Sequence, residues 1–160
     1  MIKTNRCILR YFKEEDYELF MSYRNNKEWM RYQNTEFLSN DDYRKYLLGH
    51  KNINIGIRFA ISDRITDTLL GDIYIIKKDE TISIGYTINP IYSRNGYIKE
   101  VLKVLLPLIK KSYPECEIIA MTKKENIPSK NLLLNLGFTY DEWIDKLQSE
   151  VYVYKKDIEE

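Results

Sequence analysis

The stretch that decides the fold runs from residue 84 to residue 100 and reads IGYTINPIYSRNGYIKE. Its first half is typical of a β-strand that ends at the Asn89-Pro90 turn. From Gly96 onward, apolar residues recur at the spacing of an amphipathic helix. They are Ile98, Val101, Leu102, Leu105, Leu108 and Ile109. A helix that starts just after a strand presents free backbone N–H groups and the positive end of its dipole, and both favour phosphate oxygens.

The loop between this strand and helix has two features of an anion site. Gly96 lets the backbone approach a ligand closely, and Arg94 could add a charge-assisted contact. Taken alone, the loop is better explained as a plain tight turn with Arg94 in solvent. An anion site therefore depends on what surrounds the loop.

Three β-branched stretches precede the helix and are joined by short polar connections. They are residues 57–61, 69–76 and 81–88. Connections this short favour antiparallel hairpins, because a parallel crossover needs a dozen or more residues. The helix after Gly96 supplies such a crossover, so the next strand, at 117–122, should lie parallel to 81–88.

The elements before these hairpins are a strand and two helices. A strand at 7–12 leads into residues 13–16, whose three carboxylates at 14–16 favour the start of a helix that ends near residues 25–26. Ser39 is expected to be the N-cap of a second helix, with two aspartates in its first turn.

The C-terminal third should continue the same sheet. Pro107 predicts a kink in the long helix, or its end just before that residue. A helix at 126–136 closes at Gly137, and strands follow at 138–143 and 151–155. The predicted order is β-α-α-β-β-β-α-β-α-β-β, an α/β (α+β) fold with a mixed sheet. No repeat or linker divides it, so we expect one domain over residues 1–160.

Composition excludes several classes of protein. The 160 residues are 44% hydrophobic and 31% charged, a globular balance. With 25 Lys and Arg against 24 Asp and Glu, the net charge is +1, which does not favour a nucleic-acid binder. No apolar run is long enough for a signal region or a membrane span. Cys7 and Cys116 form no CxxC pair, so we expect a cytoplasmic protein without a metal site.

A second motif begins at Asn126. This residue fits an N-cap, Pro128 is tolerated in a first helical turn, and Gly137 fits a left-handed C-cap. Helix-capping preferences therefore explain the whole segment except Ser129, which is its one candidate for a chemical role.

The two motifs together resemble the GNAT family of N-acetyltransferases. Residues 84–90 with Arg94-Asn95-Gly96-Tyr97 and Glu100 are similar to its core motif, and Asn126-x-x-Ser129 and Leu136-Gly137-Phe138 follow in the family's order. The most similar branch contains ribosomal-protein N-terminal (RimJ/RimL-like) and polyamine acetyltransferases. Thr4-x-Arg6-x-x-Leu9-Arg10 and Arg24-Asn25-Asn26 also recur in that branch. The resemblance covers essentially the whole chain.

The resemblance implies acetyl-CoA as co-substrate and no metal. The pantetheine arm enters between strand 81–88 and the next parallel strand, and pairs with the backbone near Thr87 and Ile88. Asn126 contacts that arm, and Ser129 faces the sulfur of the departing CoA. The diphosphate rests on a loop that consists of Ser93, Arg94, Asn95, Gly96, Tyr97 and Ile98.

This chain departs from the family pattern at four positions. Ser93 replaces the Gln or Arg that opens the family signature, and Ile98 replaces a small residue at its end. Leu133 stands where many relatives carry a general-acid Tyr, and Ser83 where many of this branch carry a Glu. No standard acid or base of the family is therefore intact.

The expected reaction is direct attack of a neutral amine on the thioester within a ternary complex. It needs a proton acceptor for the amine, an N–H donor for the oxyanion and a proton for the thiolate. The amide near Ile88 is the candidate oxyanion donor, and Ser129 the candidate proton donor to the sulfur. Asp72 and Tyr86 are the first candidates for the base, with a chain of waters as the alternative.

Family analogy places the amine acceptor between the two N-terminal helices and the last two strands. Acidic and aromatic side chains there suit a cationic amine. They are Glu28, Trp29, Tyr32, Glu36, Asp141, Glu142 and Trp143. A peptide N-terminus, a polyamine, an amino sugar and an aminoglycoside remain open, as do a homodimer, a non-catalytic acyl-CoA sensor and an interaction domain without cofactor.

Overall fold

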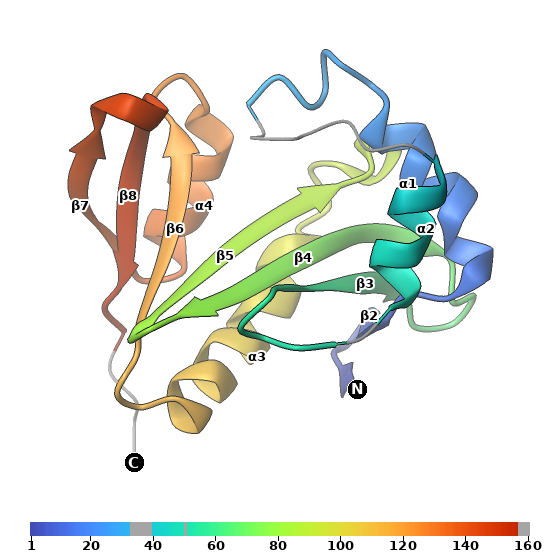
Figure 1. Cartoon of the computed structure of the whole chain (residues 1–160), viewed down its shortest axis with the longest axis horizontal. Coiled ribbons are helices and arrows are strands. Elements are labelled where there is room, and N and C mark those ends of the chain that lie inside the picture. Colours follow the sequence, from blue (N-terminus) through green and yellow to red (C-terminus); the bar gives the residue numbers. More distant parts are fainter. Residues whose placement is uncertain (33–39, 50, 157–160) are drawn as a thin grey trace.

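A computed structural model describes residues 1–32, 40–49 and 51–156, and in it one mixed sheet runs through the molecule (Figure 1). Its strand order is β1-β2-β3-β4-β5-β6-β8-β7, and only β5 and β6 pair in parallel. The strands are β1 (Ile2–Lys3), β2 (Cys7–Tyr11), β3 (Ile57–Asp63), β4 (Leu69–Lys78), β5 (Thr81–Ile88), β6 (Glu117–Lys123), β7 (Phe138–Ile144) and β8 (Ser149–Tyr154). The helices are α1 (Tyr17–Arg24), α2 (Asn40–Leu48), α3 (Tyr97–Ser112) and α4 (Ile127–Asn135), with short 3-10 turns η1 (Glu14–Asp16), η2 (Pro90–Tyr92) and η3 (Asp145–Leu147).

The predicted order of elements is confirmed, with one addition. Strand β1 precedes the first predicted strand, and its two residues are too few to carry a periodic signal. Helix α2 has Asp41 and Asp42 in its first turn, as expected. Ser39, its predicted N-cap, lies outside the described residues.

Helix α3 does not end before Pro107, as one of the two expectations for that residue required. It continues for five residues, to Ser112. Pro107 removes the partner of the Lys103 carbonyl, but both residues lie on the exposed face, where solvent can satisfy that oxygen. The opposite face buries Leu105, Leu106 and Ile109 in the core, and this packing holds the helix together across the proline.

The sheet separates two hydrophobic cores. In Figure 1, α1 and α2 lie in front of the sheet and α3 lies behind it. The larger core includes Ile61 and Ile73 of the sheet with Leu102 of α3. The smaller core includes Ala60, the neighbour of Ile61, with Phe20 of α1. Because successive strand residues point to opposite faces, one strand serves both cores.

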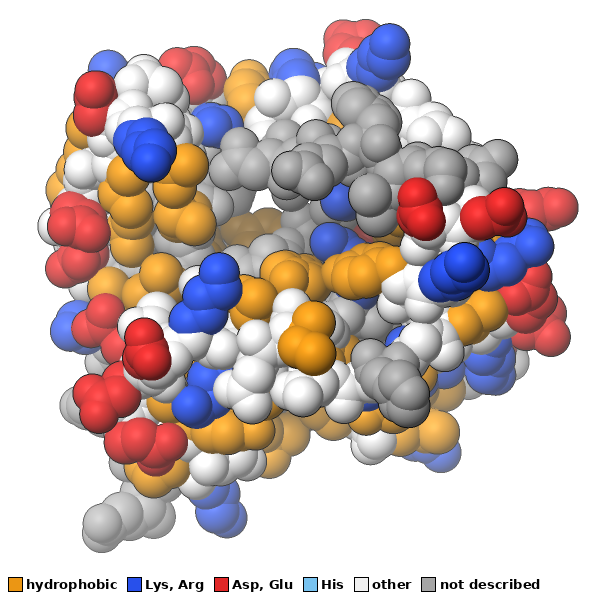
Figure 2. Space-filling model, in the orientation of Figure 1, with side chains coloured by type: hydrophobic (Ala, Val, Ile, Leu, Met, Phe, Trp, Pro, Cys, Tyr) orange, Lys and Arg blue, Asp and Glu red, His pale blue; other side chains and the backbone are white. Residues whose placement is uncertain are grey.

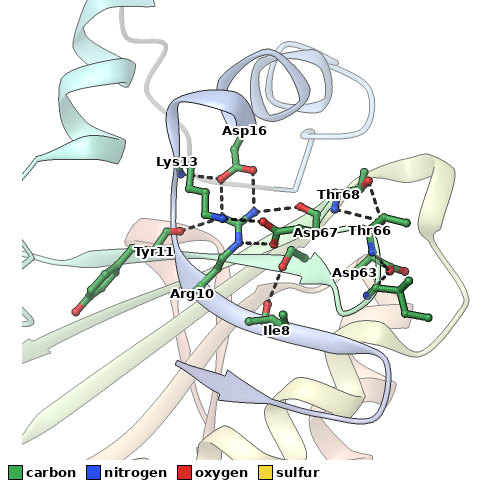
Figure 3. Close-up of polar contacts among 11 residues, drawn as sticks. Ile8, Arg10, Tyr11, Lys13, Asp16, Asp63, Thr66, Asp67 and Thr68 are labelled. Atoms are coloured by element: carbon green, nitrogen blue, oxygen red, sulfur yellow. Dashed lines mark hydrogen bonds and ion pairs between the residues drawn. The ribbon is translucent and has the colours of Figure 1, made fainter.

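A buried arginine ties the first helical turn to the β3–β4 connection (Figure 3). Arg10 is 7% exposed and makes a two-pronged ion pair with Asp16 at 2.7 and 3.0 Å. Its Nε donates to Asp67 at 2.8 Å, and Lys13 Nζ reaches the other oxygen of Asp67 at 2.7 Å. Asp67 has φ +62°, so this turn combines a left-handed backbone with an ion-pair network that fixes it.

The feature that positions the candidate site is the divergence of β5 from β6. Their parallel pairing covers only residues 81–84 of β5 and 117–120 of β6. Strand β5 continues four residues further, still paired with β4 through Ile88. Figure 1 shows the two strands separating toward the end that faces α1 and α4. Over residues 85–88, this edge of β5 is therefore not paired with β6.

Candidate active site

A cavity of about 790 Å³ opens where β5 and β6 diverge. Figure 2 shows this face of the molecule hollowed between the half that carries β6, β7 and β8 and the half that carries α1 and α2. All ten residues predicted to hold the cofactor line the cavity. They are Thr87, Ile88, Ser93, Arg94, Asn95, Gly96, Tyr97, Ile98, Asn126 and Ser129. The structure thus brings together residues from β5, from the loop before α3 and from the start of α4.

The first turn of α3 presents its backbone to this cavity. Gly96, with φ +75°, is the N-cap and has no side chain to cap the helix. The first amide bonded within the helix is that of Glu100, which donates to the Gly96 oxygen at 3.0 Å. The amides of Tyr97, Ile98 and Lys99 consequently have no acceptor inside the helix, and all three residues line the cavity. At the positive end of a 16-residue helix, they form a site for an anion.

Most of the Ile98 side chain lies outside this site. Its side chain belongs to the larger core and is 8% exposed. The core therefore accommodates most of the side chain, while the backbone N–H of Ile98 remains at the helix start.

The loop before α3 is held in an unusual conformation. Arg94 has φ +65°, a left-handed backbone that costs about 1 kcal/mol or more for a non-glycine residue. The Asn95 side-chain amide donates to the carbonyls of Tyr92 at 3.0 Å and of Ser93 at 3.2 Å. Ser93 in turn donates its hydroxyl to the Pro90 carbonyl at 2.8 Å. Two of the residues predicted to contact the cofactor thus use their side chains to shape the loop.

The charges around the cavity are mostly positive. Among its described lining residues, Arg31, Arg94 and Lys99 are cationic and Glu125 is the only carboxylate. This excess suits a phosphorylated ligand.

Tyr86 and Ser129 meet inside the cavity. The Tyr86 hydroxyl lies 2.6 Å from Ser129 Oγ, across the gap between β5 and α4. Asn126 positions Ser129 by accepting its backbone N–H at 3.3 Å, so the predicted N-cap is confirmed. Burial raises the pKa of Tyr86 to about 12, although the hydrogen bond with Ser129 opposes the shift. Tyr86 therefore stays protonated at neutral pH, so it is not available as a base but has a proton to donate.

Asp72, the other candidate base, lies on the opposite face of the sheet. It pairs in register with Thr87, whereas Tyr86 pairs with Ile73, and successive side chains alternate between faces. Asp72 is fully buried, accepts a hydrogen bond from Tyr23 and forms an ion pair with Arg58 at 2.5 Å. It is not among the residues that line the cavity. The structure thus separates the two candidates.

The backbone of Ile88 faces the gap. The Asn89 amide donates to the Leu70 carbonyl at 2.8 Å, and antiparallel pairs alternate between bonded and non-bonded. The ladder groups of Tyr86 and Ile88 must therefore point away from β4, toward the space that β6 leaves. The Trp29 indole N–H donates to the Ile88 carbonyl at 2.8 Å, which fixes Trp29 at the end of β5.

The residues predicted for the acceptor separate into two groups. Trp29 and Tyr32 line the cavity. Glu28, Asp141 and Glu142 are exposed and are not among its lining residues. Trp143 borders a separate cavity of about 340 Å³ with Lys124, Tyr140 and Glu150. Glu36 lies outside the described residues.

Sequence reasoning missed several groups of the site. Arg31, Lys99 and Leu132 line the cavity, and Arg6 contacts the loop from the N-terminal segment. Lys99 could have been found, because it follows Ile98 in the first turn of a helix already predicted. Arg31 and Arg6 depend on contacts across the fold that no local pattern encodes.

The described residues contain neither a cluster of metal ligands nor a membrane-spanning helix. No group of three or more His, Cys, Asp or Glu side chains within residues 1–32, 40–49 and 51–156 could hold a metal ion. No helix in the same part of the chain is long and apolar enough to cross a membrane.

The chain belongs to the GNAT acetyltransferase family, because the sequence model of the acetyltransferase (GNAT) domain matches residues 6–139. It is similar to the N-acetyltransferase YnaD of Bacillus subtilis (strain 168), with 27% identity over 147 residues that cover 91% of this chain and 86% of that protein.

Solved structures show the same fold. A GNAT-family acetyltransferase from Bacillus anthracis superimposes with a TM-score of 0.79 at 24% identity, over 96% of this chain and 95% of that one. The ribosomal L7/L12 α-N-protein acetyltransferase RimL, in complex with CoA, gives 0.76 at 15% identity, over 94% of each chain. Spermidine N-acetyltransferase from Vibrio cholerae, in complex with CoA and spermine, gives 0.75 at 19% identity, over 92% of each. The expected branch is thus represented among the structural neighbours.

Proposed function

We propose that this chain, as a single domain of residues 1–160, transfers an acetyl group from acetyl-CoA to a primary amine by direct attack in a ternary complex. One observation carries the proposal. A helix start with free amides and a hydrogen-bonded Tyr86–Ser129 pair open into the same cavity, between two strands that diverge. The first suits the phosphates of CoA and the second suits the departing thiol.

The donor site follows from the backbone of three elements. The diphosphate binds at the amides of Tyr97, Ile98 and Lys99, with Arg94 beside them. The pantetheine arm lies along the edge of β5 that faces the gap and pairs with it as a strand would. RimL and the spermidine acetyltransferase, which share the fold, were both solved with CoA.

The chemistry on this chain is a proton delivery. The neutral amine nitrogen bonds to the carbonyl carbon to give a tetrahedral oxyanion, and this nitrogen then releases its extra proton to water. As the C=O bond re-forms, the C–S bond breaks and the sulfur takes a proton from the Ser129 hydroxyl. Tyr86, 2.6 Å away, passes its own proton to Ser129, and solvent restores it. The backbone N–H of Ile88 stabilises the oxyanion. The ammonium of the acceptor loses its proton to water in the cavity mouth, because Asp72 is on the far face.

The acceptor binds at the Trp29 and Tyr32 end of the cavity. Arg31 lies over the Tyr32 ring at 4.6 Å, and Glu125 is the only carboxylate among the described lining residues. This charge balance favours a peptide N-terminus, with its single positive charge, over a polyamine. The two named neighbours act on one of each, a ribosomal protein and spermidine.

A non-catalytic acyl-CoA sensor is the second candidate, and one observation favours it. Leu133, where many relatives have a catalytic Tyr, is 1% exposed in the core, so no substitute side chain acts from that position. Calorimetry with acetyl-CoA tests binding, and thiol release with a panel of short peptides, polyamines and aminoglycosides tests turnover. Binding with peptide-dependent thiol release supports the transferase. Binding without release across the panel indicates the sensor, and the absence of binding contradicts both.

A further inference from the structure

The loop that leads into α3 adopts a conformation that its own residues do not favour. Arg94 has φ +65° and Gly96 has φ +75°. The internal bonds of the loop, such as the one from Asn95 Nδ2 to the Tyr92 carbonyl, hold its first half. They do not reach Gly96 or the amides after it. The half of the loop that joins the helix must therefore be held by another part of the chain.

Arg6 makes the contacts that the second half of the loop lacks. Its Nη2 donates to the Asn95 carbonyl at 2.8 Å, and its guanidinium carbon lies 4.3 Å from the centroid of the Tyr97 ring. Its Nε bonds to Glu100 Oε1 at 2.7 Å. These three contacts bracket Gly96 on both sides. A guanidinium suits this task because its planar fork can donate in several directions and stack on a ring.

The backbone around Arg6 is itself fixed. The Arg6 N–H donates to Glu100 Oε2 at 2.9 Å, and the Thr4 hydroxyl donates to the same oxygen. From the β3–β4 connection, the Arg64 N–H donates to the Arg6 carbonyl and Arg64 Nη1 to the Thr4 carbonyl, both at 2.9 Å. The backbone of Arg6 is thus held by two other parts of the chain, although Arg6 lies 89 residues from the loop in sequence.

Arg6 also offsets the negative charge of Glu100. Burial alone would raise the pKa of Glu100, but hydrogen bonds from Thr4 and Arg6 bring the pKa below its usual value. A carboxylate therefore stands in the first turn of α3, close to the amides that suit an anion. Without a neighbouring cation it would repel that anion.

We propose that Arg6 is a positioning residue for the diphosphate of CoA. It holds the backbone from Asn95 to Tyr97 in the anion-binding conformation and neutralises Glu100. The inference rests on the proposed function, because it takes acetyl-CoA as the ligand of the cavity. Arg6 acts only on the end of the ligand that carries the diphosphate, and it has no role at the thioester.

Two acyl donors separate this role from a general structural one. S-acetylpantetheine has the thioester and the pantetheine arm but no diphosphate. Arg6→Ala should raise the KM for acetyl-CoA about tenfold, as expected for the loss of a charge-assisted hydrogen bond. The kcat with acetyl-CoA and the kcat/KM with S-acetylpantetheine should stay within about twofold of wild type. The acceptor is the amine with the fastest thiol release in the panel described above.

Two further variants control the measurement. Lys103→Ala removes a cation from the exposed face of the same helix and should change neither donor's KM. Arg6→Lys keeps the charge but loses the forked guanidinium, so it should raise the KM for acetyl-CoA and not the KM for S-acetylpantetheine. If Arg6→Ala does not fold, Arg6→Lys tests the role of Arg6 in its place. An equal loss with both donors, or an unchanged KM for acetyl-CoA, would contradict the role of Arg6. Absence of CoA binding by the wild type in calorimetry would instead contradict the proposed function itself.

Discussion

Two tyrosines lie on opposite sides of the sheet and have different surroundings, half-buried Tyr86 on β5 and fully buried Tyr23 on α1. Tyr86 contacts a serine and opens to a cavity, whereas Tyr23 contacts the carboxylate of Asp72 and is 1% exposed. Burial raises the pKa of both, and for Tyr23 the charge of Asp72 adds to the effect. A raised tyrosine pKa is therefore not evidence of catalysis by itself. What distinguishes Tyr86 is its position in the cavity that opens where β5 and β6 diverge.

The charge of each cluster supports the same distinction. Asp72 is balanced by Arg58, and Tyr23 of α1 donates to the same carboxylate. Such a network gives stability, and removal of one member leaves an uncompensated charge. The Tyr86–Ser129 pair carries no charge and has a proton to give, which suits a step that creates a thiolate.

The largest expected effect is on the stability of the Asp72 cluster. Asp72→Ala should lower the free energy of unfolding by about 3–5 kcal/mol, because Arg58 is left buried without its partner. Chemical denaturation measures this. Asp72→Asn should cost less, because its amide oxygen can still accept from Arg58 while its NH2 group donates to the Tyr23 hydroxyl. Turnover per folded molecule should remain at the wild-type value in both variants. A large loss of turnover in folded Asp72→Asn would contradict this and make Asp72 a candidate base again.

A smaller effect is expected at Ser129, on the other face. Ser129→Ala should lower kcat on the order of 10²-fold, the low end of what general acid catalysis contributes, and leave acetyl-CoA affinity within about twofold. The variant keeps the backbone N–H that Asn126 caps, so α4 should be unaffected. Ser22→Ala, an exposed serine of α1, is the matched control. Steady-state thiol release at unchanged kcat would contradict the role of Ser129.

The smallest effect concerns the Arg10 network, remote from both tyrosines. Hydrogen bonding by Lys13, and then by Arg10, lowers the pKa of Asp67 to about 2. The folded pKa is below the unfolded value of about 3.9, so the ionised side chain stabilises the fold above pH 4 and the contribution is lost as pH falls toward 2. Asp67→Asn should thus cost under about 1 kcal/mol at pH 7, since the side chain is 42% exposed.

Denaturation curves at several pH values check this sign. The difference between wild type and Asp67→Asn should shrink between pH 4 and pH 2. Asp79→Asn changes another aspartate with a left-handed backbone, at φ +53°, outside the network, and serves as the control. A difference that stays constant over this pH range would show that Asp67 stabilises the turn by its backbone conformation alone.

Many of the features compared here could be predicted from the sequence. The order of elements, the loop at the start of α3 and the cap at Asn126 follow from local patterns that the structure confirms. The separation of Asp72 from Tyr86 was also accessible. The tight turn at residues 79–80 pairs Lys78 with Thr81, and counting back places Asp72 opposite Thr87 rather than Tyr86. The strand register carried this information, and a choice of candidate bases by residue type alone does not use it.

Other parts of the site could not be predicted. The approach of Tyr86 to Ser129 and of Arg6 to Asn95 depends on how distant elements pack. Pro107 misled one expectation because a proline rule is local, whereas the buried face of α3 decides whether the helix continues. Acceptor residues were the least predictable, since Trp29 and Tyr32 reach the cavity from a segment without a strong periodic pattern, while Trp143 lies elsewhere.

The most direct test of the account is a matched pair of variants, Tyr86→Phe and Tyr23→Phe, each of which removes one hydroxyl. Turnover is measured as thiol release from acetyl-CoA with the best acceptor of the panel, and stability as the melting temperature. We predict that Tyr86→Phe lowers kcat on the order of 10²-fold without a large change in melting temperature. Tyr23→Phe should lower the melting temperature and leave kcat within about twofold. Wild-type turnover by Tyr86→Phe, or a comparable loss of kcat in both, would contradict it.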